Sequence, residues 1–318
     1  MDVRTIFKII NFYARFTPDY TKIGYFARKL TWSKESPPSF SGQNWLITGA
    51  SSGLGKALMI AAVEAGASVI AVSSNRDKLN SAIAEINPLL QEFITPIVAD
   101  MALKHGTEQL LTTLVSEGHK IDVLHNNVGV LFNELELTDE GRETTYVINV
   151  MSHYLMTKGL VEADALNRGA VVVNMTSGGM YNAPLSTTGL NNTDPKTYNG
   201  KIAYAYAKRA QVALTDYWNK IYGDRDISFY VTHPGWTRTP GVKKALPIFW
   251  ILQNPILRTP RQGCDTALWL CMTNPELKKD VVWFDRKARP THIFEFTRAP
   301  RCSLEELADY FDKDIEHG

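Results

Sequence analysis

Cysteine is scarce in this chain of 318 residues, which contains only Cys264, Cys271 and Cys302. An odd count without a Cys-x-x-Cys pair argues against a disulfide framework and against a zinc site, and we expect no metal. Cys264 and Cys271 are close enough along the chain to share one helix face. We therefore expect both to be small core residues, which fits a reducing compartment.

The chain also lacks an excess of charge of either sign, since 34 Lys and Arg residues against 33 Asp and Glu residues leave a net charge of +1. This balance gives no general attraction to nucleic acid, and we expect no such partner. No run reaches the roughly 18 consecutive apolar residues of a membrane-spanning helix, and the first residues do not follow a secretory signal pattern. We expect an intracellular protein, either cytoplasmic or bound peripherally to a membrane. The sequence does not identify the organelle.

Residues 1–40 form an N-terminal extension in which apolar residues recur at helical spacing, among them Val3, Ile6, Ile10 and Tyr13. Basic residues outnumber acidic ones there. A basic amphipathic helix either packs across the body of the protein or lies on a membrane surface, and both alternatives stay open. The serines and prolines of residues 36–39 predict a linker to the rest of the chain.

Residues 41–318 alternate between strand and helix patterns. The predicted strands are rich in β-branched residues and nearly continuous in hydrophobicity, as a parallel sheet covered on both faces requires; they span residues 44–47, 68–72, 95–99, 123–126, 169–174 and 227–231. Helices are predicted at residues 56–65, 76–86 and 303–317. We therefore predict the α/β class, with a single doubly wound parallel sheet, a Rossmann fold, preceded by the N-terminal helical extension.

A glycine-rich turn, residues 48–55, lies between the first strand and the first helix, and its glycines follow the spacing G-x-x-x-G-x-G. Glycine lets the backbone approach a pyrophosphate held at the positive end of the helix. With a strand before it and a helix after it, the turn predicts a dinucleotide site rather than an ordinary glycine-rich turn. We expect cofactor contacts from Thr48, Gly49, Ser51, Ser52, Gly53, Leu54 and Gly55.

The end of the second strand bears on the choice of cofactor. NAD usually has its ribose 2′-hydroxyl bound by an acidic side chain at this place, but the chain has Ser74, Asn75 and Arg76 there. Asn75 and Arg76 could accept a 2′-phosphate, which favours NADP(H) and leaves NAD(H) as the alternative. Arg76 could also simply begin a solvated helix. Asp100, followed by Met101 after the third strand, either accepts a hydrogen bond from adenine or caps a helix.

Tyr204 and Lys208 form a Tyr-x-x-x-Lys pair, in which both side chains leave the same helix face. A free tyrosine has a pKa of about 10, and a nearby ammonium lowers it. Tyr204 could then exchange a proton with a carbonyl or alcohol oxygen, although a chance Tyr and Lys on an amphipathic helix is the alternative. Ser177 ends a predicted strand, where open α/β sheets bind ligands. Asn149 is either a water-binding residue near Lys208 or a buried amide bonded to backbone.

The chain resembles the short-chain dehydrogenase/reductase family, and more loosely its retinol-dehydrogenase-like branch. The resemblance rests on the order along the chain of Gly49, Gly53, Gly55, Asn149, Ser177, Tyr204 and Lys208. Residues 126–129 are similar to the family's Asn-Asn-Ala-Gly, and residues 234–239 to its Pro-Gly-x-x-x-Thr. The resemblance implies a Rossmann fold, an NAD(P) cofactor and a catalytic tetrad of Asn149, Ser177, Tyr204 and Lys208. It also implies cofactor contacts from Asn126, Asn127, Gly129, Tyr204, Lys208, Pro234, Gly235, Thr237 and Thr239.

The chain departs from the family pattern at two places. Ser177 and Tyr204 are farther apart than is common, so we expect residues 185–200 to form an inserted surface loop near the rim of the site. Ser74 stands where an arginine commonly serves NADP in this branch, which weakens the preference for NADP but not the fold.

Residues 240–260 occupy the place of the family's substrate lid, and residues 245–252 within them are strongly apolar. Three alternatives stay open for this segment: a lid over a lipophilic substrate, a homodimer or membrane contact, and plain core.

We therefore predict an oxidoreductase that transfers a hydride between NADP(H) and the carbonyl or alcohol of a lipophilic small molecule, such as a lipid aldehyde, ketone, retinoid or steroid. The main alternative is a non-enzymatic dinucleotide-binding sensor or scaffold, which would not need the tetrad. An epimerase or dehydratase is a further alternative. The substrate, the direction of the reaction and the oligomeric state stay open.

Overall fold

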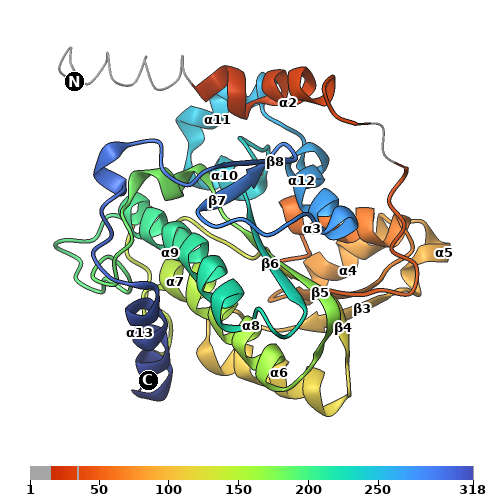
Figure 1. Cartoon of the computed structure of the whole chain (residues 1–318), viewed down its shortest axis with the longest axis horizontal. Coiled ribbons are helices and arrows are strands. Elements are labelled where there is room, and N and C mark those ends of the chain that lie inside the picture. The colour runs from red at the N-terminus through yellow and green to blue at the C-terminus, as the bar shows by residue number, and fades with distance from the viewer. Residues whose placement is uncertain (1–15, 34–35, 318) are drawn as a thin grey trace.

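The computed structural model describes residues 16–33 and 36–317. The predicted helical spacing at residues 3–13 lies outside this part of the chain. An eight-stranded sheet with the order β3-β2-β1-β4-β5-β6-β7-β8 runs through the molecule (Figure 1). Its strands are β1 (Asn44–Thr48), β2 (Ser68–Ser73), β3 (Ile94–Val98), β4 (Ile121–Asn126), β5 (Leu166–Met175), β6 (Ile227–Thr232), β7 (Val281–Phe284) and β8 (Lys287–Pro290).

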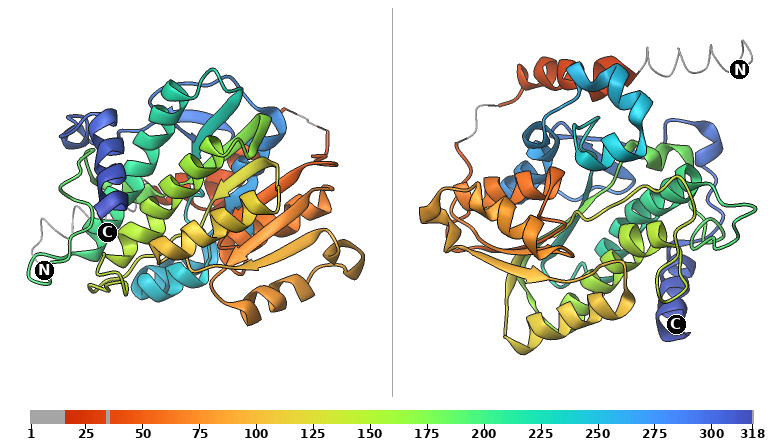
Figure 2. Two further views of the ribbon diagram at one scale, coloured as in Figure 1. Left: turned by 90° about the horizontal axis from the view of Figure 1, so that it is seen from below. Right: turned by 180° about the vertical axis from the view of Figure 1, so that it is seen from behind.

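The sheet is parallel from β3 through β7, and β8 alone is antiparallel to its neighbour. Helices cover both faces, so the predicted doubly wound fold is confirmed (Figures 1 and 2). One core lies between the sheet and α6 (Lys104–Ser116), α8 (Ser152–Glu162), α9 (Gly200–Ile221) and α13 (Leu304–His317). The other core lies between the sheet and α3 (Gly53–Glu64), α4 (Arg76–Ala84) and α12 (Pro260–Thr273).

Shorter helices connect these layers: α2 (Lys22–Lys29), α5 (Pro88–Gln91), α7 (Thr144–Tyr146), α10 (Pro240–Ala245) and α11 (Pro247–Gln253). Cys264 and Cys271 are buried in α12, as expected. The predicted C-terminal helix is also confirmed. Its first turn is capped reciprocally, because Ser303 Oγ accepts from the Glu306 amide and the Glu306 carboxylate accepts from the Ser303 amide.

The β7–β8 hairpin did not follow from the sequence. Asp285 and Arg286 form its turn with positive φ angles of 49° and 58°, which few residues other than glycine adopt readily. Arg286 pairs with Asp265 at 2.8 Å and lies over the ring of Trp32. These contacts stabilise a turn that the sequence pattern alone does not indicate.

The described part of the N-terminal extension packs across the body of the protein, which was one of the two expected alternatives. Arg258 holds it, because its guanidinium donates to the backbone carbonyl oxygen of Tyr20 at 3.0 Å and forms a buried ion pair with Asp285 at 2.6 Å. The amide of Trp236 also donates to the Tyr20 carbonyl oxygen, at 2.8 Å. Residues 16–33 therefore form a strap, named here the N-terminal strap, on the side of the molecule where α11 lies (Figures 1 and 2).

No helix in the described part of the chain combines the length and the apolar character needed to cross a membrane.

Candidate active site

The glycine turn joins β1 to α3 in the arrangement that the sequence predicts. A Cβ on Gly55 would lie only 2.2 Å from the carbonyl oxygen of Gly49, so only glycine fits at this point. Ser52 is the N-cap residue of α3 but makes no capping hydrogen bond with its side chain, and the first turn carries no acidic residue. The amide groups at the positive end of α3 are therefore suited to a pyrophosphate.

Three of the predicted catalytic side chains meet at the carboxyl ends of β5 and β6. Ser177 is the second residue after the end of β5, and Tyr204 and Lys208 project from α9 into the same cavity. Ser177 forms a side-chain hydrogen bond with Tyr204. The three groups are thus close enough to act on one substrate oxygen.

Lys208 is almost fully buried and has no carboxylate partner among the described residues. Its Nζ donates to the carbonyl oxygen of Met175 at 3.0 Å and lies 5.5 Å from the centre of the Tyr204 ring. Burial lowers the pKa of Lys208 to about 7. Its amino group can therefore be neutral or protonated near neutral pH, which suits a group beside an acid–base centre.

The pKa of Tyr204 differs from the sequence-based expectation. Burial raises it above the usual value for tyrosine, and the hydrogen bond with Ser177 opposes this rise. We expected the ammonium of Lys208 to lower the pKa, but its Nζ is directed to the backbone of Met175. In the protein alone, the cost of burying a phenolate outweighs the neighbouring charge.

Asn149 lies in a π-helical turn, Val147–Met151, and is completely buried. Its side-chain amide accepts from the amide of Val130 and donates to the carbonyl oxygens of Val130 and Thr145. Its own carbonyl oxygen accepts from Gln211 Nε2 at 2.6 Å. Asn149 thus joins the loop after β4 to α9, and its side chain follows the second alternative, a buried amide bonded to backbone.

The Asn149 side chain nevertheless lies beside Lys208. A Cβ on Gly129 would come within 2.8 Å of Asn149 Oδ1 and 3.3 Å of Lys208 Nζ. Asn149 therefore positions the loop that borders the lysine.

Several residues of the predicted cofactor set point into the protein. Asn126 donates to Thr157 of α8 and to Asn174 of the neighbouring strand β5, and Met101 is buried in the core. Thr48 Oγ1 donates to the carbonyl oxygen of His125 and accepts from the amides that follow β4. These side chains stabilise the loops around the site, and they do not point towards the place of a cofactor.

The remaining predicted cofactor residues lie along one edge of the sheet. Ser74, Asn75 and Arg76 are exposed at the end of β2, where Asn75 also caps α4 by accepting from the amide of Lys78. Asp100 is exposed after β3 and accepts from the amide of Ala102, so it closes a turn and does not cap α6. Towards the tetrad, the cavity is lined by Leu54, Asn127, Gly129, Pro234, Gly235, Thr237 and Thr239.

A cavity of about 490 Å³ surrounds Ser177, Tyr204 and Lys208. Its outer wall is mostly aromatic and was not predicted from the sequence; it comprises Phe16, Tyr20, Tyr181, His233, Trp236, Phe249 and Phe294. Two of these residues come from the N-terminal strap and one from α11. The apolar segment at residues 245–252 thus contributes to the cavity wall, as the lid alternative required.

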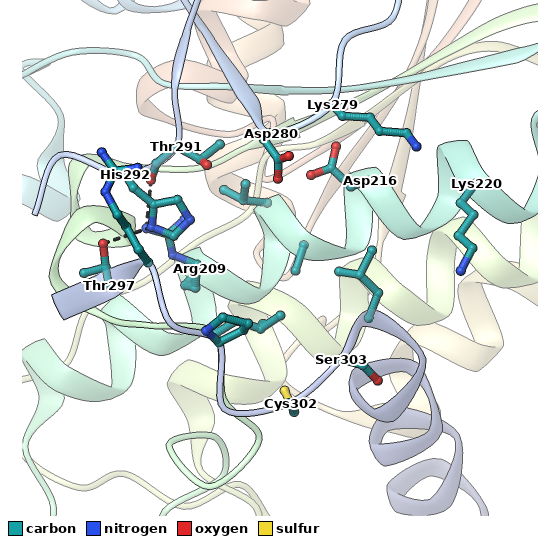
Figure 3. A pocket seen from close by; sticks show the side chains of 16 residues that line it. Arg209, Asp216, Lys220, Lys279, Asp280, Thr291, His292, Thr297, Cys302 and Ser303 are labelled. Atoms are coloured by element: carbon teal, nitrogen blue, oxygen red, sulfur yellow. Dashed lines mark hydrogen bonds between the residues drawn. The ribbon is translucent and has the colours of Figure 1, made fainter. Parts of the chain in front are cut away.

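A second cavity of about 340 Å³ shares no lining residue with the first and lies on the outer side of α9 (Figure 3). Arg209 donates there to the carbonyl oxygen of Thr291, and His292 Nδ1 lies 2.9 Å from Thr297 Oγ1. Burial, aided by the nearby charge of Asp280, raises the pKa of Asp216 to about 6. Among the described residues, no group of three or more His, Cys, Asp or Glu side chains is placed to hold a metal ion.

Comparison with known proteins decides the family. A model of the short chain dehydrogenases matches residues 43–247, well over half of the chain. The chain belongs to the short-chain dehydrogenase/reductase family. It is therefore an NAD(P)-dependent oxidoreductase that acts on alcohol or carbonyl groups of small molecules.

Individual relatives agree with this assignment. The chain is 31% identical over 293 residues to human dehydrogenase/reductase SDR family member 12, with 91% of each chain covered. It is 22% identical over 286 residues to human retinol dehydrogenase 13, covering 86% of this chain and 83% of that protein. The fold is similar to that of 3-ketoacyl-(acyl-carrier-protein) reductase from Brucella melitensis complexed with NADH, with a TM-score of 0.58, 20% identity, and 76% and 95% of the two chains covered.

Proposed function

We propose that this short-chain dehydrogenase/reductase is an NADP(H)-dependent carbonyl reductase or alcohol dehydrogenase for a lipophilic small molecule. The observation that carries the proposal is the convergence of Ser177, Tyr204 and Lys208 in one cavity. The uncapped end of α3 supports a dinucleotide at the edge of the sheet next to this cavity. The aromatic wall supports an apolar substrate on the other side.

In the proposed reaction, Tyr204 gives a proton to the carbonyl oxygen during reduction and takes it back during oxidation. Ser177 holds this oxygen by a hydrogen bond. The ammonium of Lys208 favours the phenolate form of Tyr204 and can hold the nicotinamide ribose. Asn149 supports proton transfer by fixing the loop beside Lys208. A nicotinamide bound beside these residues would supply or accept the hydride.

The end of β2 supports NADP(H) over NAD(H). Ser74, Asn75 and Arg76 are exposed there, so an arginine guanidinium is available for a 2′-phosphate and none of the three is acidic. A carboxylate would be needed at this place to bind the 2′-hydroxyl of NAD in the usual way.

The substrate class follows from the wall of the cavity. Phe16, Trp236 and Phe249 supply large apolar surfaces, and Trp236 and Phe249 meet edge to face at 5.1 Å. The name of the relative retinol dehydrogenase 13 points to the same kind of substrate. Lipid aldehydes, ketones, retinoids and steroids share this character.

A substrate panel tests the proposal. Decanal, all-trans-retinal and a steroid ketone should be reduced with NADPH faster than with NADH, and the matching alcohols should be oxidised with NADP⁺. A small water-soluble ketone such as acetone serves as the control and should react poorly. NADPH binding without turnover of any probe would favour the sensor alternative.

We also propose a peripheral membrane contact through α2 and α11. Ile248, Ile251 and Leu252 on α11 are 74%, 75% and 66% exposed, and Leu30 beside α2 is 89% exposed. Lys29 is exposed at the end of α2, and Lys243 and Lys244 are exposed on α10, which precedes α11 in the chain. Apolar side chains framed by lysines suit an anionic bilayer.

Sedimentation with phosphatidylcholine–phosphatidylserine vesicles tests the membrane contact. The double variant Ile251→Glu/Leu252→Glu should bind several-fold less protein to the vesicles than the wild type. Leu89→Glu on α5 is the matched control, since Leu89 is also 76% exposed but lies away from α2 and α11 (Figure 1). Equal losses in both variants would contradict the assigned face.

A further inference from the structure

His233 is a buried polar residue in the aromatic wall and has no part in the proton transfer proposed above. It follows β6 directly and is 2% exposed. Its ring stacks on Tyr20 of the N-terminal strap at 4.9 Å between ring centres and meets the edge of Phe284 at 5.1 Å. These contacts fix the plane of the imidazole ring.

The hydrogen bond at one ring nitrogen determines where the His233 proton lies. Nδ1 accepts from the backbone amide of Gly235 at 2.7 Å. Burial, together with the positive charge of Arg258, lowers the pKa of His233 to about 3. The ring is therefore neutral, and because Nδ1 is the acceptor, Nε2 carries the proton.

The Nε2–H group has no hydrogen-bond partner within the described residues. Leaving a buried donor unpaired destabilises a protein, so a partner is expected from outside the protein. Nε2 lies 3.0 Å from the point that a Cβ on Gly178 would occupy. A side chain at Gly178 would therefore crowd this nitrogen, and glycine lets the backbone after Ser177 lie close to the His233 ring.

The donor lies close to the reacting centre. Gly178 directly follows Ser177, and a Cβ on the next residue, Gly179, would lie 2.9 Å from Tyr204 Cε1. Since consecutive Cα atoms are about 3.8 Å apart, His233 and Tyr204 face neighbouring points of one backbone segment. Both line the same cavity. A single substrate could reach both side chains.

We propose that His233 is a specificity-determining residue whose Nε2–H donates a hydrogen bond to a second oxygen of the substrate. This inference rests on the proposed function and narrows it. The preferred substrate is a lipophilic carbonyl compound or alcohol with an ether, carbonyl or hydroxyl oxygen apart from the reacting group. A plain hydrocarbon aldehyde would leave the donor unpaired and would bind less tightly.

Two variants separate the roles of the two ring nitrogens. His233→Asn keeps an acceptor near the position of Nδ1 for the Gly235 amide and removes the distal donor. His233→Gln places an amide N–H near the position of Nε2 and gives up the Nδ1 acceptor. Thermal unfolding of both variants shows whether each still folds.

The probes are 4′-pentylacetophenone and isomers in which an oxygen replaces one methylene at successive positions of the pentyl chain. Calorimetry on the NADP⁺-loaded protein gives their dissociation constants without turnover. At least one oxygen-containing isomer should bind the wild type about tenfold more tightly than 4′-pentylacetophenone, as expected for a buried hydrogen bond. The preference should persist in His233→Gln and vanish in His233→Asn.

Equal binding of all isomers to the wild type would overturn the proposal, as would an unchanged preference in His233→Asn. A loss of NADP⁺ affinity in His233→Asn without a change in isomer preference would assign the donor to the nicotinamide and also overturn it. Failure of the proposed function appears differently, because the wild type would then discriminate among the isomers but reduce none of them with NADPH.

Discussion

Replacing Arg258 by methionine should destabilise the protein and weaken substrate binding together, because Arg258 fastens the N-terminal strap to the cavity. Its side chain is 1% exposed and that of its partner Asp285 is 2% exposed. The guanidinium pairs with both carboxylate oxygens, at 2.6 and 2.9 Å, and donates to the backbone carbonyl oxygens of Tyr20 and Asp19. It also lies 4.6 Å from the centre of the Phe284 ring.

The expected loss of unfolding free energy follows from the burial of this ion pair. Removing one partner of a buried ion pair costs about 3–5 kcal/mol of unfolding free energy, and in Arg258→Met the buried Asp285 carboxylate keeps only Arg28, which compensates its charge in part. Arg28 bonds the same Asp285 carboxylate at 2.5 Å, but its side chain is 17% exposed and solvent screens it more strongly. Arg28→Met should therefore cost only about 1 kcal/mol. The pair Arg258→Met/Asp285→Leu should recover part of the loss, since no carboxylate is then left beside a missing arginine.

Urea unfolding of the four proteins gives these free energies, and steady-state kinetics with NADPH gives the KM values. The KM for a lipophilic ketone should rise about tenfold in Arg258→Met, because Phe16 and Tyr20 leave the cavity wall. The KM for NADPH should change less than about twofold, since the hydrogen bonds of Arg258 do not involve the turn at residues 48–55. A stability loss below about 1 kcal/mol, or a higher KM for NADPH with an unchanged KM for the ketone, would refute the reasoning.

Three further predictions concern single residues. Lys208→Met should stabilise the cofactor-free protein by roughly 1–3 kcal/mol at pH 6. Burial lowers the Lys208 pKa from 10.5 to about 7, so the cost of burying the ammonium is complete below pH 7 and shrinks as the pH rises towards 10.5. An equal difference in unfolding free energy between variant and wild type at pH 6 and pH 9 would contradict this. Arg76→Ala should raise the KM for NADPH about tenfold and leave that for NADH within about twofold, because a charged hydrogen bond to phosphate is lost; equal changes would argue against a phosphate contact. Ser303→Ala should lower the unfolding free energy by about 1 kcal/mol, since it breaks the cap of α13; an unchanged urea midpoint would show that the cap contributes nothing.

Local patterns were enough to predict the parallel sheet from β1 to β6, the glycine turn and the convergence of Ser177, Tyr204 and Lys208. Each depends on a few neighbouring residues whose spacing has a direct structural meaning, such as one helical turn between Tyr204 and Lys208. The cap of α13 was predictable for the same reason. Motif membership was less informative for Thr48 and Asn126, because a motif position does not tell whether a side chain faces the cofactor or a neighbouring strand.

The aromatic wall could not be predicted, since it depends on contacts between distant parts of the chain. The bond from Arg258 to Tyr20 spans 238 residues, and no local signal pairs them. The direction of the Tyr204 pKa depends on burial, which competes with the neighbouring charge and is visible only in the folded protein. His233 carried one usable signal, since a histidine directly before Pro-Gly at the end of a strand lies where open α/β sheets bind ligands.

The proton transfer assigned to Tyr204 is tested most directly by Tyr204→Phe, assayed with NADPH and a ketone that the wild type reduces. The turnover number should fall by a factor of about 10² to 10⁴, the usual contribution of a general acid. The dissociation constant for NADPH should stay within about twofold, because the variant loses one hydroxyl group and keeps Lys208 and the turn at residues 48–55. A variant that keeps its turnover while binding NADPH normally would contradict the assignment of Tyr204 as the proton donor.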